Sequence, residues 1–188
     1  MNLENFDIKS TIVINTAFSY ASENNYAYLV PLNILEVMIK TNEDIKSTLE
    51  HFSVNLDNLY LESQELSKST KKKNEKEETL IQGNIIMLME QAQKEAKKIG
   101  YKKINCNIIL LVLTNDISPQ SKLLLEKHGV TYYKLFNLLN AKKESKNSEM
   151  EFIKKYTIDI TDLALNNKID PIIGRDEEIK RTIQIISR

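Results

Sequence analysis

The feature that most constrains the fold is an internal repeat with a spacing of about 75 residues. The matched positions, which lie between 74 and 76 residues apart, are residues 30–35 with 104–109, Leu49 with Leu125, and Val54 with Val130. Self-similarity of this kind indicates two copies of one supersecondary unit that pack against each other. We therefore expect a doubled domain.

Each copy is expected to be helical. Only four glycines and three prolines occur among the 188 residues, which leaves few turns for a fold of many short strands. Apolar residues recur instead at intervals of three and four, the spacing of one helix face. The stripe of the first copy is Ile14, Ala17, Phe18 and Ala21, and that of the second is Ile85, Leu88, Met89, Ala92, Ala96 and Ile99. This pattern predicts an all-α fold.

The periodic segments suffice for four helices in each copy. A long helix is followed by a shorter apolar one, over residues 32–39 or 108–113, and then by two short helices with a turn between them. Asn55 and Thr131 are good N-caps for the fourth helix of each copy, and Gly129 suits the turn before it in the second. The two copies together predict an eight-helix double-repeat bundle.

Two polar stretches divide the chain. Residues 68–78 and 140–151 mix both charge signs with almost no apolar side chains, which is typical of solvated linkers. All three arginines lie beyond the second stretch, so the composition changes there as well. The predicted divisions are a first repeat (1–67), a charged linker within the domain (68–78), a second repeat (79–139), a linker (140–155) and a tail with a last helix (156–188).

Composition excludes several classes of partner. The 26 basic and 26 acidic side chains cancel, so neither a nucleic acid nor an anionic membrane is expected to bind. The single cysteine, Cys106, cannot form an internal disulfide, and its apolar surroundings predict a buried, inert thiol. The first ten residues contain Glu4 and Asp7 and no apolar run of signal-peptide length, and no run approaches the roughly 20 apolar residues that span a bilayer, so neither a signal peptide nor a membrane span is expected. We expect a cytoplasmic protein.

The tail carries the most specific motif of the chain. Residues 156–188 read YTIDITDLALNNKIDPIIGRDEEIKRTIQIISR, which closely resembles the opening segment of the first ATPase module in Clp-type unfoldases of the AAA-plus superfamily. The doubled unit before it is similar to the paired Clp repeats of that family's N-terminal domain. The resemblance implies a Clp N-terminal domain, then a linker and the truncated start of an AAA-plus module with its first helix.

Three positions depart from the family pattern. Asn33 and Asn107 stand where the family usually has histidine at the start of the second helix of each repeat, so the apolar face persists without that histidine. Asn167 replaces a glycine of the tail motif, and asparagine is among the few residues that tolerate a left-handed backbone. The helices and the turn are therefore expected to form.

The resemblance implies a function in binding other polypeptides. The family's N-terminal domain docks adaptor proteins and captures apolar segments of unfolded or aggregated clients, which the ATPase rings then thread through a pore. Candidate client-binding residues here are Tyr26, Tyr28, Leu32 and Leu35, although core packing explains these apolar runs at least as well. Tyr132 and Tyr133 offer similar amphipathic surface, with helix-end packing as the favoured alternative.

The resemblance also bears on nucleotide binding and catalysis. In a complete parent protein, Ile172, Ile173, Gly174 and Arg175 correspond to the segment that lies against the adenine of ATP. No G-x-x-x-x-G-K-[ST] phosphate loop occurs in this chain, so we expect no ATP hydrolysis, no catalytic residue and no cofactor here, with ATP and magnesium bound only by the parent. His51 and His128 are isolated in the sequence, which predicts surface imidazoles and no metal site.

Two branches of the family remain open as the parent. The tail looks most like the disaggregase ClpB, a chaperone of the stress response and protein quality control. The second repeat is as similar to the ClpA and ClpC unfoldases, which act as regulatory subunits of a Clp protease and partner a Clp peptidase. A free-standing interaction module and a helical scaffold outside this family are further alternatives. The family's rings are hexamers, and this chain is expected to be a monomer because the ATPase modules make most ring contacts.

Overall fold

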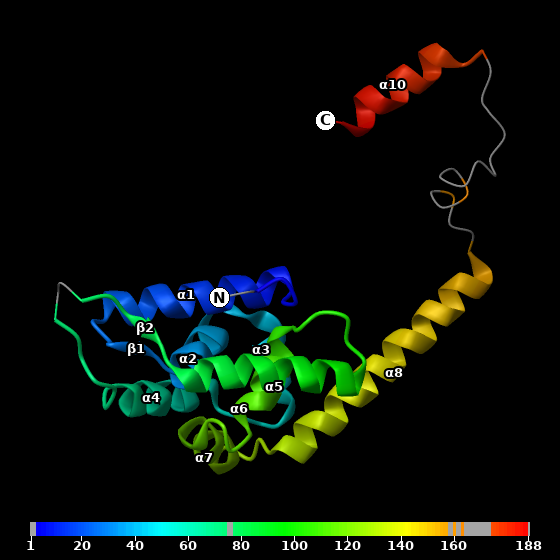
Figure 1. The fold of residues 1–188 in the computed structure, drawn as a ribbon. Coiled ribbons are helices and arrows are strands. Elements are labelled where there is room, and N and C mark those ends of the chain that lie inside the picture. Colours follow the sequence, from blue (N-terminus) through cyan, green and yellow to red (C-terminus); the bar gives the residue numbers. More distant parts are fainter. Residues whose placement is uncertain (1–2, 75–76, 158–159, 161–162, 164–173, 188) are drawn as a thin grey trace. The chain divides into compact units, whose positions relative to one another are not determined.

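The computed structural model describes residues 3–74, 77–157, 160, 163 and 174–187. These residues are mostly helical (Figure 1), so the predicted all-α class is confirmed. The elements of the first repeat are α1 (Ile8–Glu23), β1 (Tyr28–Leu29), α2 (Pro31–Thr41), α3 (Glu43–His51) and α4 (Leu56–Ser67). Those of the second are β2 (Leu80–Ile81), α5 (Gly83–Ile99), α6 (Cys106–Leu113), α7 (Pro119–Lys127) and α8 (Tyr132–Tyr156), and α10 (Asp176–Ile186) follows in the tail.

The doubling is visible in the backbone. Phe6 bridges to Ile104, while Leu29 pairs with Ile81, so a shift of 75 residues maps each of these contacts onto the other. Such reciprocal contacts indicate an approximate twofold relation between the copies. The left-handed turns repeat as well, since the residues with positive φ are Asn25 and Ser53 in the first copy and, at the equivalent places, Gly100 and Gly129 in the second.

Side-chain caps fix where the helices begin. The Asn55 side chain accepts from the backbone N–H of Asn58 at the start of α4, as predicted. Asn105 caps α6 in the same way, and its counterpart at the start of α2 is Val30, 75 residues earlier. Asn33 therefore corresponds to Ile108, and the sequence alignment that matched it with Asn107 was wrong by one residue.

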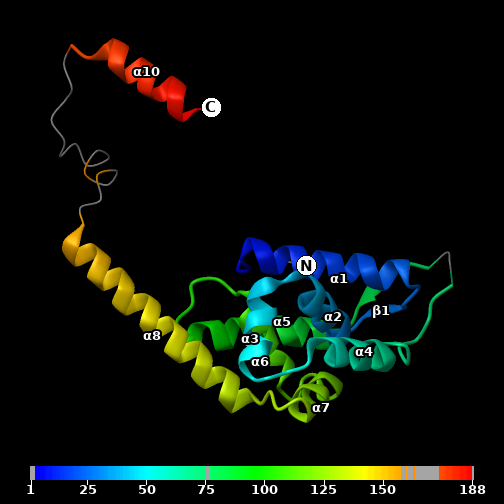
Figure 2. The same ribbon diagram turned by 180° about the vertical axis from the view of Figure 1, so that it is seen from behind.

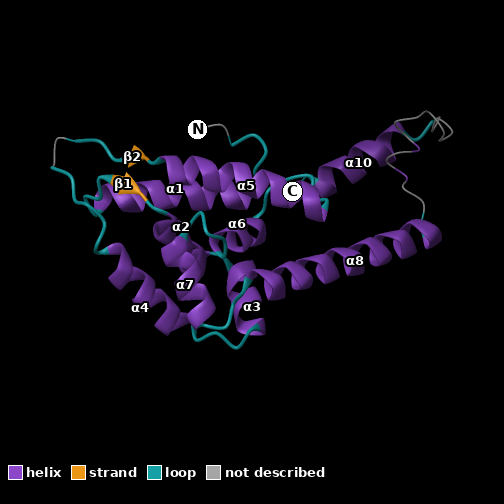
Figure 3. Ribbon diagram, turned by 60° about the horizontal axis from the view of Figure 1, so that its bottom comes forward, coloured by secondary structure: helices purple, strands orange, loops and turns teal. Residues whose placement is uncertain are grey.

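The core is centred on the two apolar helices. Every residue of α2 from 31 to 39 is buried, as is every residue of α6 except Asn107. In Figure 3 these helices lie between the long helices α1 and α5 on one side and α3, α4 and α7 on the other, and Figure 2 shows α3 beside α6. Full burial of a leucine or isoleucine stabilises a fold by about 1.5–3 kcal/mol, so these helices are its main source of stability.

A short parallel strand pair, which the sequence did not predict, joins the copies. Tyr28 lies opposite Leu80 and Leu29 opposite Ile81, and two residues are too short a run for alternation to show (Figure 3). The charged segment 68–78 also contacts this region. The Ala27 N–H donates to the Lys71 carbonyl at 2.8 Å, and Lys72 Nζ lies 3.8 Å from the centroid of the Tyr26 ring. The described part of this segment is therefore held against the end of α1.

By its contacts the chain divides into two units, residues 1–143 and 144–188. Residues 140–155, predicted as a linker, are helical and belong to α8. In the second unit α10 forms as predicted, with Asp176, Glu177 and Glu178 in its first turn, where carboxylates complement the helix dipole. Its Ile179, Ile183 and Ile186 are exposed within that unit.

Candidate functional site

The predicted client-binding residues lie mostly in the core. Leu32 and Leu35 are at most 1% exposed, and Tyr26 is 4% exposed under Lys72. The physical reason is that α2 carries apolar side chains over most of its surface, with only Asn33 and Glu36 as polar residues between positions 31 and 39, so it is enclosed by the other helices. These three side chains offer no contact surface to a client, and only Tyr28 is partly exposed.

Of the other residues considered in the sequence, Cys106 has the predicted environment and His128 does not. Cys106 is buried as expected, beside the Ser10 hydroxyl and the Asn42 amide, and burial raises the pKa of its thiol. His128 is not the surface imidazole that was predicted: its side chain is 13% exposed and its Nε2 lies 3.4 Å from Glu62 Oε2, because α7 ends against α4. Within the described residues, no three His, Cys, Asp or Glu side chains gather as a metal site.

Of the four predicted adenine-contacting residues, Ile172 and Ile173 lie outside the described residues. Gly174 has a positive φ of 79° and is exposed. Arg175 is also exposed and directly precedes α10. The two described residues thus form the turn into that helix.

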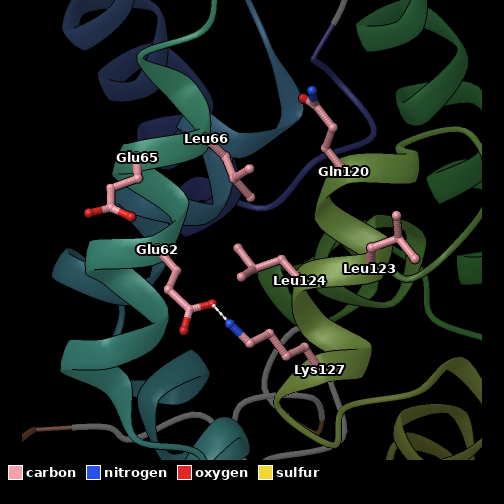
Figure 4. Close-up of a pocket in the computed structure, with 7 residues that line it drawn as sticks. All are labelled: Glu62, Glu65, Leu66, Gln120, Leu123, Leu124 and Lys127. Atoms are coloured by element: carbon pink, nitrogen blue, oxygen red, sulfur yellow. Dashed lines mark hydrogen bonds and ion pairs between the residues drawn. The ribbon is translucent and has the colours of Figure 1, made fainter.

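An open groove lies between α4 of the first repeat and α7 of the second (Figure 4). It has a volume of about 530 Å³ and is lined by Glu62, Glu65, Leu66, Gln120, Leu123, Leu124 and Lys127. Leu66 and Leu124 point into the space between the helices, with Gln120 near one end. Leu66 is 38% exposed although it is a large apolar side chain. The groove thus presents accessible leucine on a surface otherwise rich in charge.

An ion pair crosses one end of the groove. Lys127 Nζ, on α7, donates to Glu62 Oε2, on α4, at 2.8 Å (Figure 4). This hydrogen bond, with His128 nearby, lowers the pKa of the Glu62 carboxyl. Glu65 stands on the α4 edge one turn from Glu62. The arrangement suits an apolar segment lying between the helices, with a basic residue beside the Glu65 edge.

Sequence reasoning missed this groove. Leu66, Leu123 and Leu124 fall on helical segments where leucine is equally typical of core. The groove exists only because helices from different copies meet, and no periodicity within one helix reports that contact. Exposed apolar residues also occur on the long helices, where Ile12 of α1 and Met87 of α5 are equivalent by the 75-residue shift and more than half exposed.

The arrangement defines a doubled helical domain with an open apolar groove between its copies. Residues 5–128 match the family described as "Clp repeat (R) N-terminal domain", and the chain belongs to that family. Similar curated proteins include the chaperone protein ClpB of Rhodopseudomonas palustris, 30% identical, and that of Rickettsia bellii, 32% identical. All of this chain aligns with them, but it spans only 22% and 23% of their lengths.

Solved structures show the same fold at low sequence identity. The Hsp104 N-terminal domain of Candida albicans has a TM-score of 0.63 at 16% identity, covering 75% of this chain and 92% of that one. A ClpV N-domain in complex with a VipB peptide has a TM-score of 0.59 at 14% identity, with 75% and 92% covered. The likeness establishes the fold of the doubled domain.

In the described part of the chain, none of the helices combines the length and the apolar character that crossing a membrane requires.

Proposed function

We propose that this domain binds apolar segments of other polypeptides, either clients or adaptor proteins, in the groove between α4 and α7. The observation that carries the proposal is the open groove at the junction of the copies, into which the exposed Leu66 points across from the buried Leu124. Burying a leucine of the partner there removes apolar surface from water on both sides. A relative of the same fold, a ClpV N-domain, was solved with a bound peptide, which supports this class of partner.

The charges at the groove indicate which residues flank the apolar segment that binds there. Glu62 is already paired with Lys127, so Glu65 is the acidic side chain left at the α4 edge to attract a basic group. An apolar segment flanked by lysine or arginine fits both features. Such segments are buried in native proteins and become exposed when a client unfolds.

Fluorescence anisotropy with a labelled leucine-rich peptide flanked by lysines tests this assignment on the full chain. Leu66→Asp places a charge in the groove and is expected to weaken binding at least about tenfold. The matched control is Leu61→Asp on the same helix, since Leu61 is 57% exposed and does not line the groove. Equal loss in both variants, or no loss in Leu66→Asp, would refute the proposal.

We further propose that the domain serves a larger ATP-dependent unfoldase. The support is that the chain spans about 22% of its ClpB relatives and that its tail resembles the start of an ATPase module. The names of these relatives favour the disaggregase branch over a regulatory subunit of a Clp protease. The parent would bind ATP and magnesium and form a hexamer, with Ile172, Ile173, Gly174 and Arg175 against the adenine.

This chain has no phosphate loop of its own and is expected to release no phosphate from ATP. A steady-state phosphate assay on the purified chain checks this. Release above the buffer background that follows the protein through purification would contradict the expectation.

A further inference from the structure

A second opening lies within the first repeat, between α1, α2 and α4. It has a volume of about 300 Å³ and is lined by Thr16, Ser19, Tyr20, Glu23, Glu36, Val37, Lys40, Thr41 and Tyr60. It shares no lining residue with the α4–α7 groove. The two sites can therefore be tested separately.

The unusual residue of this cleft is Glu36, a carboxyl in the middle of the apolar helix α2. It is 2% exposed. Ser67, the last residue of α4, donates from its hydroxyl to Glu36 Oε1, whereas Oε2 has no hydrogen-bond partner among the described residues. The Tyr20 hydroxyl lies near the carboxyl without bonding to Oε2. Burial raises the pKa of Glu36, and the two hydroxyls oppose that rise.

The second repeat shows that packing does not require a carboxyl at this place. The residue equivalent to Glu36, 75 positions later, is Leu111, which is fully buried in α6. A buried polar atom without a partner costs about 1–3 kcal/mol. The first repeat carries this cost where the second has a leucine.

The fold does satisfy a buried carboxylate elsewhere. Glu95 of α5 is 5% exposed and accepts from Gln91 at 3.0 Å on Oε1 and from the Tyr132 hydroxyl at 2.9 Å on Oε2. Both oxygens of Glu95 are therefore bonded within the domain, in contrast to those of Glu36. The difference suggests that the partner of Glu36 Oε2 comes from outside the chain.

The lining of the cleft indicates a cation as that partner. Glu23 adds a second carboxyl to the lining, and the Tyr60 ring already has a cation, Lys40 Nζ, 5.9 Å from its centroid. Aromatic faces and carboxylates are the usual surroundings of a buried ammonium or guanidinium group. Val37 and the tyrosine rings can cover the aliphatic stem of such a side chain.

We propose that this cleft binds the cationic side chain of a lysine or arginine from a bound polypeptide, with its charged group hydrogen-bonded to Glu36 Oε2. Because Oε2 is buried, a lining side chain has to change rotamer first, and the partly exposed Tyr20 is the one beside the carboxyl. The interaction adds a contact with a buried carboxylate, whereas the Glu65 carboxylate at the α4–α7 groove is exposed.

Binding of the cationic side chain is then linked to the protonation of the Glu36 carboxyl. Burial raises the pKa of Glu36, whereas a neighbouring cation lowers it, so binding releases a proton at any pH where the free domain holds this carboxyl protonated. The other titratable groups that face this carboxyl or line its cleft are Tyr20 and Glu23 of α1, Tyr26 after α1, Lys40 of α2 and Tyr60 of α4. Lys40 is the competing cation among them.

Calorimetry on the full chain tests the proposal with short peptides of one sequence that carry lysine, arginine, citrulline or norleucine at the central position. The cationic peptides are expected to bind at least about tenfold more tightly than the neutral ones, because only they pair with the carboxylate. Lysine and arginine arms show which cation the cleft prefers. Repeating the titration in buffers of different ionisation enthalpy measures the released proton.

Glu36→Gln keeps the shape of the side chain and is expected to abolish both the preference for a cation and the proton release. Glu36→Leu, the residue of the second repeat, is a second variant that should fold and show the same loss. Glu95→Gln is the matched control and should bind as the unmodified chain does. Equal affinity for citrulline and arginine, an unchanged affinity in Glu36→Gln, or no binding at millimolar peptide would overturn the proposal.

Discussion

The two repeats share a backbone and differ in the side chains at equivalent places. Left-handed turns, the reciprocal bridges and the order of helices all recur after 75 or 76 residues. The side chains at the α4–α7 groove do not recur at the equivalent place. The groove between α4 and α7 has Leu66 and Leu124, whereas the equivalent place between α8 and α3 has Lys142 and Thr48, joined by a hydrogen bond of 3.2 Å.

The same contrast appears inside each copy. The first has a cleft with the underbonded Glu36, while the second has Leu111 at that position and a fully bonded Glu95. Duplication thus accounts for the fold, and divergence between the copies accounts for the candidate sites. Residues that break the repeat are therefore better guides to function than residues that obey it.

The largest change in stability is expected at buried positions where the two copies have the same residue. Leu49 of α3 and Leu125 of α7 are equivalent and fully buried. Replacing either by alanine should lower the free energy of unfolding by about 3 kcal/mol, because each leaves a cavity in one continuous core. Urea denaturation followed by circular dichroism measures this. A cost below about 1 kcal/mol for one of them would show that its copy does not share the core.

The Glu36→Leu substitution is expected to have the next largest effect on stability, and this change should stabilise the domain. It should stabilise the domain by about 2 kcal/mol at neutral pH, because it removes a buried, underbonded carboxyl. Burial holds the pKa of Glu36 above its ordinary value of 4.5. The folded state therefore binds the proton more tightly, and this group's contribution to stability is greatest at acid pH and falls as pH rises through the folded pKa.

Urea denaturation at several pH values checks the direction of this pH dependence. The advantage of Glu36→Leu over the unmodified chain should shrink on acidification toward and below pH 4.5. An advantage that grew on acidification would contradict the assignment of Glu36 as a carboxyl with a raised pKa.

The equivalent turns give a paired prediction of smaller size. Gly129→Ala should cost about 1 kcal/mol, since its φ of 79° is strained for a residue with a Cβ. Ser53 occupies the same turn at φ 58°, so Ser53→Gly should be neutral or stabilising by up to about 1 kcal/mol. Thermal unfolding of both variants tests the pair, and a loss of stability in Ser53→Gly would break the equivalence of the turns.

The smallest effect is expected for the ion pair at the end of the groove. Lys127→Met removes the partner of Glu62, but both side chains are partly exposed, so the urea midpoint should not change measurably. The same variant leaves Glu62 with only His128 beside it and removes a positive charge from the groove, so it should tighten binding of a lysine-flanked peptide. Weaker binding would show that Lys127 itself contacts the ligand.

The sequence predicted the fold in detail because its determinants are local. The stripe of Ile14 and Ala17, the cap at Asn55 and the turn at Gly129 each act within a few residues, and the repeat spacing then pairs the copies. The two-residue strands were too short to leave a pattern. The register error at Asn33 arose because the caps of α2 and α6 differ.

The candidate sites were harder to predict, since they depend on contacts between helices far apart in sequence. Leu32 and Leu35 were named as candidate client-binding residues with core packing as the alternative, and the structure confirms core packing, since residues 31–39 of α2 are all buried. The same helix held a usable signal, because Glu36 interrupts an apolar run at a position where the other copy has leucine. Nothing comparable separates Leu66 from a core leucine.

The most direct test of the account is to map a bound peptide on the full chain by amide chemical shifts. A leucine-rich, lysine-flanked peptide should shift resonances along α4 and α7, around Leu66 and Leu124, and leave the equivalent α3 and α8 positions near Thr48 and Lys142 unchanged. Shifts of equal size at both places, or confined to α3 and α8, would contradict the claim that divergence between the copies created the binding groove.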